Sequence, residues 1–278
     1  MSAPNLQSSG IGGTTGAALV PLSPLYITGD IWYVSSVTGS DAGSPRGKER
    51  ERPLATLAQA ITNAAAGDII VCLSGHSETL TGSQAISTAG LLILGEGSGS
   101  SRPQFTRNGD VVMFNVSGAG VRIENLHFPA STTASANSRV KFSAANDQLV
   151  NCYFEHGAND TGPGLETVTG ASQVEVRSTT FISTSTDVTA QPSHAIKVTN
   201  AITDLRIGGD TDADAVTIDG ASSGWSNPYA INLAAAVTRL RAQKVDLLNG
   251  SDVILTTGST GYFHVRNASG GSRIVWPA

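Results

Sequence analysis

Charge is scarce in this sequence of 278 residues. Asp, Glu, Lys and Arg make up 14% of the chain, against about 25% in an average globular protein. Long helices and coiled coils are rich in Glu, Lys and Arg, so the shortage excludes them as the main architecture. The net charge is −5, and the densest basic stretch, residues 46–52, contains two glutamates. No basic face is indicated, so we expect no nucleic-acid partner.

Cysteine, aromatic residues and long apolar runs are also rare. The two cysteines, Cys72 and Cys152, both lie in short apolar runs, which favours buried free thiols over a disulfide or metal site. No apolar run approaches the ~20 residues that cross a bilayer, so we expect no membrane partner. Residues 1–45 contain no Lys or Arg and therefore lack the charged start of a signal peptide. We expect synthesis in a cytoplasm without export by the ordinary route.

Short apolar segments separated by Gly, Asn and Ser turns recur along the chain. The segments that end at Phe128, Phe154 and Phe181 share a residue pattern and are spaced by 26 and 27 residues. Such a period is typical of a solenoid, in which each unit buries its apolar face against its neighbours. We therefore predict an all-β parallel β-helix, with an antiparallel sandwich or jelly roll as the alternative.

Matching positions in these repeats predict which residues stack. Ile123, Leu149 and Val176 are expected in one line inside the rod, and the three phenylalanines in another. Asn125, Asn151 and Ser178 are expected at equivalent turns, where Asn tolerates left-handed backbone and can bond to its stacked neighbour. Later segments match the repeat pattern less closely but are also possible strands; they lie around residues 205–207, 216–218, 240–245, 253–255 and 263–265.

The N-terminal region differs from the repeats. Residues 1–29 form a predicted extended arm, because Pro21 and Pro24 exclude a regular helix or central strand there. Its apolar side chains require a surface, so we expect them to contact another subunit; the alternative is a tail without fixed structure. These predicted assembly residues are Leu19, Val20, Leu22, Leu25, Tyr26 and Ile27.

The β-helix domain is predicted over residues 30–278. It begins with a strand at Ile31–Val37, followed by a polar turn segment. A helix is predicted at Leu54–Ala66, because its apolar residues recur at helical spacing, with Gly67 in the position that ends a helix. We expect this helix to cap the open end of the rod and to cover its strand edges.

One stretch carries a more specific pattern. YVSSVTGSDAG at residues 33–43 is followed by RPLATLAQAI at 52–61 and GDII at 67–70. This order resembles the N-terminal segment of pectin-lyase-like right-handed parallel β-helix proteins, in which a strand and a GSD turn lead to a capping helix and the first coil. The resemblance implies that fold, and homotrimers are the usual assembly of such rods. The superfamily includes polysaccharide lyases, glycoside hydrolases and phage spike and decoration proteins, so the fold does not select a function.

Candidate site residues are few. Asp210, Asp212 and Asp214 resemble the start of a calcium loop, but Ala215 and Ala221 replace its glycine and closing glutamate, leaving a weak metal candidate beside a solvated acidic turn. The hydrolase pair of carboxylates is missing, so the segments 155–157 and 194–197, which echo the motifs that accompany such a pair, carry no reaction alone. Trp225 and Tyr229 are candidate glycan contacts, although packing of their loop is the simpler interpretation.

Three functions fit these observations. The first, which we favour, is a non-enzymatic virion protein of a tailed bacteriophage: a capsid decoration or spike/fibre-type protein made in the host cytoplasm. Its expected partners are copies of itself, as a homotrimer, and virion proteins such as the major capsid protein, with a host surface glycan as a further candidate. The alternatives are a polysaccharide-binding or polysaccharide-degrading β-helix protein and a bacterial surface or adhesion module. We expect no catalytic residues and no cofactor.

Overall fold

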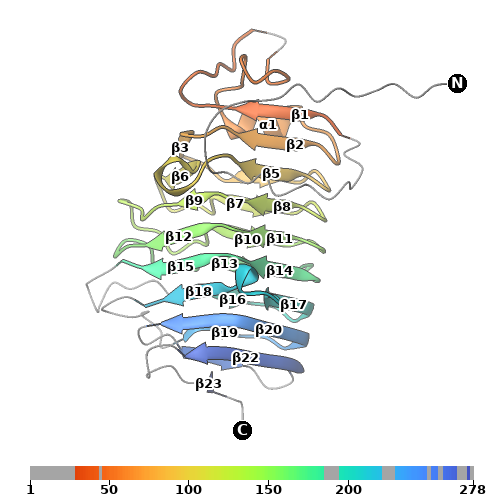
Figure 1. Ribbon diagram of the computed structural model, residues 1–278, viewed down its shortest axis with the longest axis vertical. Helices are drawn as coiled ribbons and strands as arrows, with labels where there is room; N and C mark the ends of the chain where they lie inside the picture. Colours follow the sequence, from red (N-terminus) through yellow and green to blue (C-terminus); the bar gives the residue numbers. More distant parts are fainter. Residues whose placement is uncertain are drawn as a thin grey trace, which may run out of the picture.

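A computed structural model describes residues 29–43, 46–184, 194–220, 229–248, 252–255, 259–267 and 274–275. Over these residues the chain winds into a rod of stacked coils, with its N-terminal end at the top of Figure 1. Strands of successive coils pair in parallel. The right-handed parallel β-helix is therefore confirmed, and the antiparallel sandwich is excluded.

The coils have three faces. The first face consists of β1 (Ile31–Val34), β2 (Ile69–Cys72), β5 (Leu92–Gly95), β8 (Arg122–Glu124), β11 (Gln148–Val150), β14 (Val174–Arg177) and β17 (Ile202–Gly208). The second consists of β3 (Ser77–Leu80), β6 (Gln104–Arg107), β9 (His127–Phe128), β12 (Tyr153–His156), β15 (Thr180–Ser183) and β18 (Val216–Asp219). The third consists of β4 (Gln84–Ile86), β7 (Phe114–Val116), β10 (Val140–Phe142), β13 (Leu165–Thr167), β16 (Ile196–Val198), β19 (Tyr229–Leu233), β21 (Asp252–Leu255) and β23 (Ile274–Val275).

One long strand joins the first two faces. β20 (Val237–Leu248) pairs with β17 through its first half and with β18 through its second half. The first and second faces therefore belong to a single 15-stranded sheet, and β22 (Gly261–Asn267) continues it beyond β20. The third face is a separate 8-stranded sheet, so the rod is enclosed by two sheets of stacked strands.

The expected stacking lines are both present. Leu149 pairs with Ile123 on one side and with Val176 on the other, and all three are fully buried. The ring of Phe154 stacks on those of Phe128 and Phe181, with centroid separations of 4.5 and 4.7 Å. The spacing of 26–27 residues thus equals one coil, because it places like side chains directly above one another.

The helix is shorter than the sequence indicated. α1 is Leu57–Asn63, and Thr56 caps it by accepting from the Gln59 amide. Leu54 lies before the helix in an extended segment, where it forms a parallel bridge with Val34. Gly67 has a left-handed φ of 83° but lies in the turn into β2, beyond Ala64, the residue that caps the end of the helix. The backbone pairing of Leu54 to β1 therefore takes precedence over its helical spacing.

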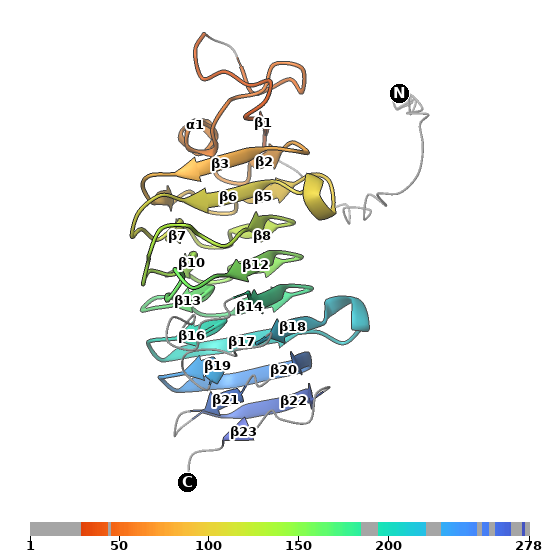
Figure 2. The ribbon, with the colours of Figure 1, turned by 90° about the vertical axis from the view of Figure 1, so that its left-hand side faces the viewer.

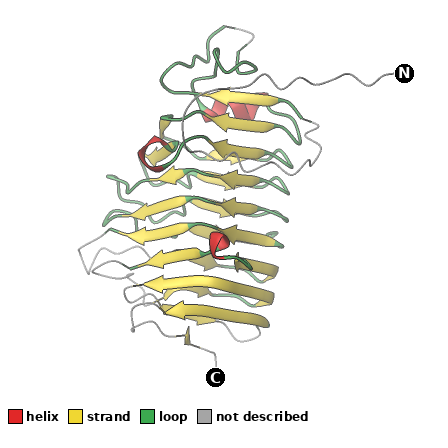
Figure 3. Cartoon of the chain, viewed as in Figure 1, coloured by secondary structure: helices red, strands yellow, loops and turns green. Residues whose placement is uncertain are grey.

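The capping role of the helix is confirmed. α1 contacts β1, β2 and β4 and lies at the N-terminal end of the rod (Figure 3). Leu57 and Ala60 are fully buried within the core. The helix buries only a short apolar face, because its other residues are wholly or partly exposed at the end of the rod.

The first strand is also shorter than expected. β1 ends at Val34, and the next residues form a turn in which the Ser35 hydroxyl accepts from the amides of Val37 and Thr38. Val37 is 76% exposed, because the turn carries it out of the sheet. Cys72 and Cys152 are buried free thiols, as expected, and burial raises the pKa of the Cys152 thiol to about 12.

Candidate functional site

The corner between the first and second faces carries a line of left-handed residues. Asn125, Asn151 and Ser178 have φ values of 58°, 50° and 51°. The Asn151 side-chain amide donates to Asn125 Oδ1 at 3.1 Å, and the Asn125 amide donates to the Gly95 carbonyl at 2.7 Å. The turns are therefore equivalent, and the side-chain bonds link consecutive coils, as the sequence predicted.

Two short 3-10 turns bracket this corner. η1 (Gly99–Ser101) lies between β5 and β6, and η2 (Asp212–Asp214) lies between β17 and β18. Figure 2 shows both turns projecting from the same side of the rod. The tight corners at Asn125, Asn151 and Ser178 belong to the coils between η1 and η2. The three polar corner residues therefore form a line on this side of the rod, with one projecting turn beyond each end of the line.

A cluster of mixed chemistry lies beside η1, and we call Arg102, His127, Tyr153 and Glu155 the side cluster. Arg102 follows η1 and reaches Asn151 Oδ1, with 3.5 Å between Nη2 and the oxygen. The His127 and Tyr153 rings meet edge to face, with centroids 5.1 Å apart. His127 Nε2 lies 3.5 Å from Glu155 Oε1. Arginine, imidazole, phenol and carboxylate groups are therefore presented together on the outer surface of the second face.

Burial sets the protonation states in the side cluster. It lowers the pKa of His127, with the Glu155 charge opposing and the Arg102 charge reinforcing the change. Burial also raises the pKa of Tyr153, and the Glu155 charge adds to this. At neutral pH the imidazole and the phenol are therefore uncharged, which suits hydrogen bonding to hydroxylated ligands. Sequence reasoning missed this cluster, although His127 and Tyr153 occupy matching positions of adjacent repeats.

The two histidines of the hydrolase-like segments are internal. His156 is fully buried, and its pKa is far below the usual range because of burial and the charges of Arg139 and Arg107. Its neighbour Glu155 is on the outer face of the same strand, so the two point to opposite sides. His194 is also buried and lies 3.0 Å from the Asn232 side-chain amide through Nε2.

The acidic triplet is divided among separate partners. Asp212 Oδ1 lies 2.9 Å from Lys244 Nζ, whereas Asp214 accepts from the Thr211 hydroxyl at 2.7 Å. Asp210 precedes these residues in the same turn. Within the described ranges, no group of three His, Cys, Asp or Glu side chains is placed to hold a metal ion.

Several predicted residues lie outside the described part of the chain. These are the arm residues Leu19, Val20, Leu22, Leu25, Tyr26 and Ile27, together with Trp225. Tyr229 begins β19, but its side chain falls outside the description.

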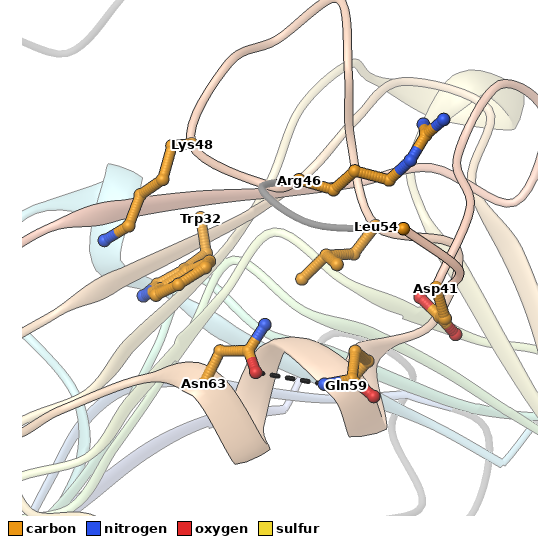
Figure 4. A pocket seen from close by; sticks show the side chains of 8 residues that line it. Trp32, Asp41, Arg46, Lys48, Leu54, Gln59 and Asn63 are labelled. Atoms are coloured by element: carbon orange, nitrogen blue, oxygen red, sulfur yellow. Dashed lines mark hydrogen bonds between the residues drawn. The ribbon is translucent and has the colours of Figure 1, made fainter.

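A pocket of about 470 Å³ lies at the capped end of the rod. Figure 4 shows Trp32, Arg46 and Lys48 on its upper side, and Gln59 and Asn63 on α1 beneath. Lys48 Nζ lies 3.7 Å from the centroid of the Trp32 ring, so the cation covers that ring. On α1, Gln59 donates to Asn63 at 3.0 Å.

Comparisons with known proteins extend only to the fold. No protein-family model matches the sequence, and no curated protein matches it. Among solved structures, a rhamnogalacturonan lyase matches with a TM-score of 0.46 and 12% identity, covering 89% of this chain and 84% of its own. A structure entitled pectate lyase Pel9A matches with a TM-score of 0.37 and 13% identity, covering 88% and 78%. In the described part of the chain, no helix is long and apolar enough to span a membrane.

Proposed function

We propose that the chain is a non-enzymatic structural protein of a tailed-bacteriophage virion, of the capsid-decoration or spike type. In this proposal the rod attaches to the particle at its N-terminal end, through residues 1–29 and the adjoining outer face. Its partners are further copies of the chain, as a homotrimer, and the major capsid protein. Residues 33–70 resemble the N-terminal segment of pectin-lyase-like β-helix proteins, and that superfamily includes phage proteins of this kind.

The observation that carries the proposal is a change along one row of outward-facing residues. We call this the outer row: Ile31, Ile69, Leu92, Arg122, Gln148, Glu175, Arg206, Arg241 and Tyr262, each paired with the next. Its first three members are apolar, and Ile31 is 37% exposed. From Arg122 to Arg241 the row is polar or charged. The apolar members at the N-terminal end include the exposed Ile31, although Ile69 is only 7% exposed and the row ends at Tyr262, which is 54% exposed. Exposed apolar side chains beside residues 1–29 favour protein contact at that end.

Charges on the other coils also suit a scaffold. Arg122 lies 2.7 Å from Glu124, and Glu175 lies between Arg177 and Arg206 at 3.3 and 3.6 Å. Each of these carboxylates faces a cation, whereas glycoside hydrolysis uses two carboxyl groups that face each other across ~5–9.5 Å. Exposed pairs add only about 0–1 kcal/mol each, so their effect is to neutralise charge along the row.

Particle binding tests the attachment surface. Deletion of residues 2–25 should leave the β-type circular dichroism unchanged while abolishing co-sedimentation with purified particles. Ile31→Lys should weaken binding in the same assay, because a charge is placed on the apolar end of the outer row. Tyr262→Lys is the matched control at the opposite end of the row, where Tyr262 is 54% exposed, and it should bind normally. If the deletion binds as well as the full chain, the arm has no role in attachment.

The virion assignment itself is tested by composition. Mass spectrometry of purified particles of the phage that encodes the chain should detect it in a fixed ratio to the major capsid protein. Its absence from those particles would overturn the proposal.

A second candidate function is binding or cleavage of a polysaccharide, and the side cluster favours it. Tyr153 and His127 offer ring surface, and Arg102 and Glu155 offer charged hydrogen-bonding groups, on one partly exposed surface. On our main proposal, the purified protein should release no unsaturated or reducing ends from pectate, alginate or capsule, with or without calcium. Release that Glu155→Gln removes would establish the enzyme instead. Glycan binding that Tyr153→Ala removes, without cleavage, would establish a lectin-like role.

A further inference from the structure

The interior of the rod contains a charged cluster at the ends of second-face strands. Arg107 ends β6, and His156 and Ser183 are paired at the ends of β12 and β15. Arg139 directly precedes β10, and Asp160 lies in the turn after β12. The side chains of Arg107, Arg139 and Asp160 are 0–1% exposed. The cluster is therefore enclosed by the coils.

Asp160 is the centre of this cluster. Its Oδ1 lies 2.8 Å from Arg107 Nη2, and its Oδ2 lies 2.8 Å from Arg139 Nη2. Oδ2 also accepts from the backbone amides of Ser131 at 2.7 Å and Gly157 at 3.3 Å. A single carboxylate thus serves two guanidinium groups and two amides that hold the neighbouring turns.

Among the residues that the structure describes, the charges in the cluster do not balance. Two arginines and one aspartate leave one excess positive charge. His156 adds none, because burial and the two arginines keep its pKa far below neutral. Glu155 contributes a weaker negative charge from the outer face of β12, where its Oε1 lies 3.5 Å from Nε2 of the uncharged His127. An uncompensated buried charge is strongly unfavourable.

Hydrogen-bond donors in the same place lack partners. Nε and Nη1 of Arg139 and Nε of Arg107 are buried and have no acceptor among the described residues. The remaining donors are already used, since Arg107 Nη1 donates to the Asn137 carbonyl at 2.7 Å and Arg139 Nη2 also donates to the Pro129 carbonyl at 3.0 Å. Buried guanidinium donors without acceptors are rare in native proteins. The charge and the donors therefore indicate the same missing component.

We propose that the rod holds one small monovalent anion of the halide class, bound at the unpartnered donors of Arg139 beside the Arg107–Asp160–Arg139 cluster. The anion must be monovalent because the imbalance is a single charge. It must be small because the side chains of Arg107, Arg139 and Asp160 are only 0–1% exposed. A water molecule would satisfy a donor but would leave the excess charge uncompensated. The site is independent of the virion proposal, since it lies in the core and needs no partner protein.

Bromide provides the direct test on the full-length protein. Crystals grown in sodium bromide should show an anomalous-scattering peak within about 3.5 Å of Arg139. The same crystals should show none beside Arg122, which is the matched arginine on the outer row. Density at Arg139 without anomalous signal would identify water and overturn the proposal, as would the absence of any density.

Thermal unfolding provides the second test. A ligand that binds only the folded state raises Tm in a saturable way. Chloride should therefore raise Tm by a few degrees over sodium gluconate of equal ionic strength, because gluconate is too large to enter. Arg139→Gln removes the excess charge and should abolish the difference, whereas Arg122→Gln should retain it. If wild-type Tm is equal in the two salts, no functional halide site exists. If Arg139→Gln fails to fold, the bromide crystals of the wild type decide.

Discussion

The second face has two rows of inward-facing side chains, offset by two positions along each strand. One row is aromatic and the other is polar. One row contains Phe105, Phe128, Phe154 and Phe181, and the other contains Arg107, His156 and Ser183, two positions farther along the chain. Aromatic rings stack on copies of themselves, so each coil can repeat the last. Arg107 has no charged copy in the polar row and instead pairs with Asp160, which comes from a turn and also binds Arg139. A repeat therefore supplies the first row, whereas the second is built from residues that occur once.

The largest effect should come from removing the centre of the polar row. Asp160→Asn leaves Arg107 and Arg139 buried without a carboxylate, and breaking one buried pair already costs about 3–5 kcal/mol. We expect a loss at or above the top of that range in urea unfolding followed by circular dichroism at pH 7. Asp212→Asn is the control, since the Asp212 side chain is 75% exposed and its ion pair with Lys244 lies at the surface, and it should cost less than about 1 kcal/mol.

The phenylalanine row should be the next most sensitive. Phe154→Ala removes the ring between two stacked neighbours and should cost about 3–5 kcal/mol of unfolding free energy. Phe154→Leu keeps part of the volume and should cost less. Should Phe154→Ala prove more damaging than Asp160→Asn, the repeat rather than the charged cluster would dominate the stability of this part of the core.

Asp147, a buried carboxylate with no cation partner in the described part of the chain, sharpens the contrast with Asp160. Asp147 is fully buried, and burial raises its pKa to about 7 despite bonds from backbone amides such as Val121. Because the folded pKa exceeds the unfolded value, its stabilising contribution is complete below about pH 4 and is lost as pH rises through 7.

Asp147→Asn should therefore stabilise the protein at high pH. The variant keeps an acceptor for the Val121 amide but carries no charge, so we expect a gain of about 2–4 kcal/mol at pH 8 relative to the difference at pH 4. Urea midpoints of the wild type and the variant across this range measure it. A constant difference between the two proteins would show that the carboxyl group does not titrate in this window.

The corner turns should show the smallest effect. Asn151→Ala places alanine in the left-handed conformation, at φ 50°, and removes the side-chain hydrogen bond to Asn125. Together these changes should cost about 1–2 kcal/mol of unfolding free energy. Asn151→Gly removes the same bond without the backbone strain and should cost less. Equal losses for the two variants would assign the effect to the side-chain bond alone, and thermal unfolding distinguishes these outcomes.

The site region was less accessible to sequence reasoning than the coils. The side cluster joins Arg102 to residues from two later coils, and nothing in the local pattern indicates that η1 brings this arginine to Asn151. The acidic triplet did have a local signal, but the turn directs Asp212 to Lys244 and Asp214 to Thr211. The ends of the predicted helix and first strand were wrong for a similar reason, because pairing of Leu54 with Val34 fixed the backbone there.

The sequence by itself determined the repeat, the solenoid, the two stacking lines and the left-handed corners, because residues one coil apart share type and spacing. Only the tertiary structure decided which polar residues meet. Arg107, Arg139 and Asp160 are separated by 21 to 53 positions and occur outside the repeated pattern. Their contact depends on how turns of different length fold back into the rod, which local propensity and periodicity do not specify.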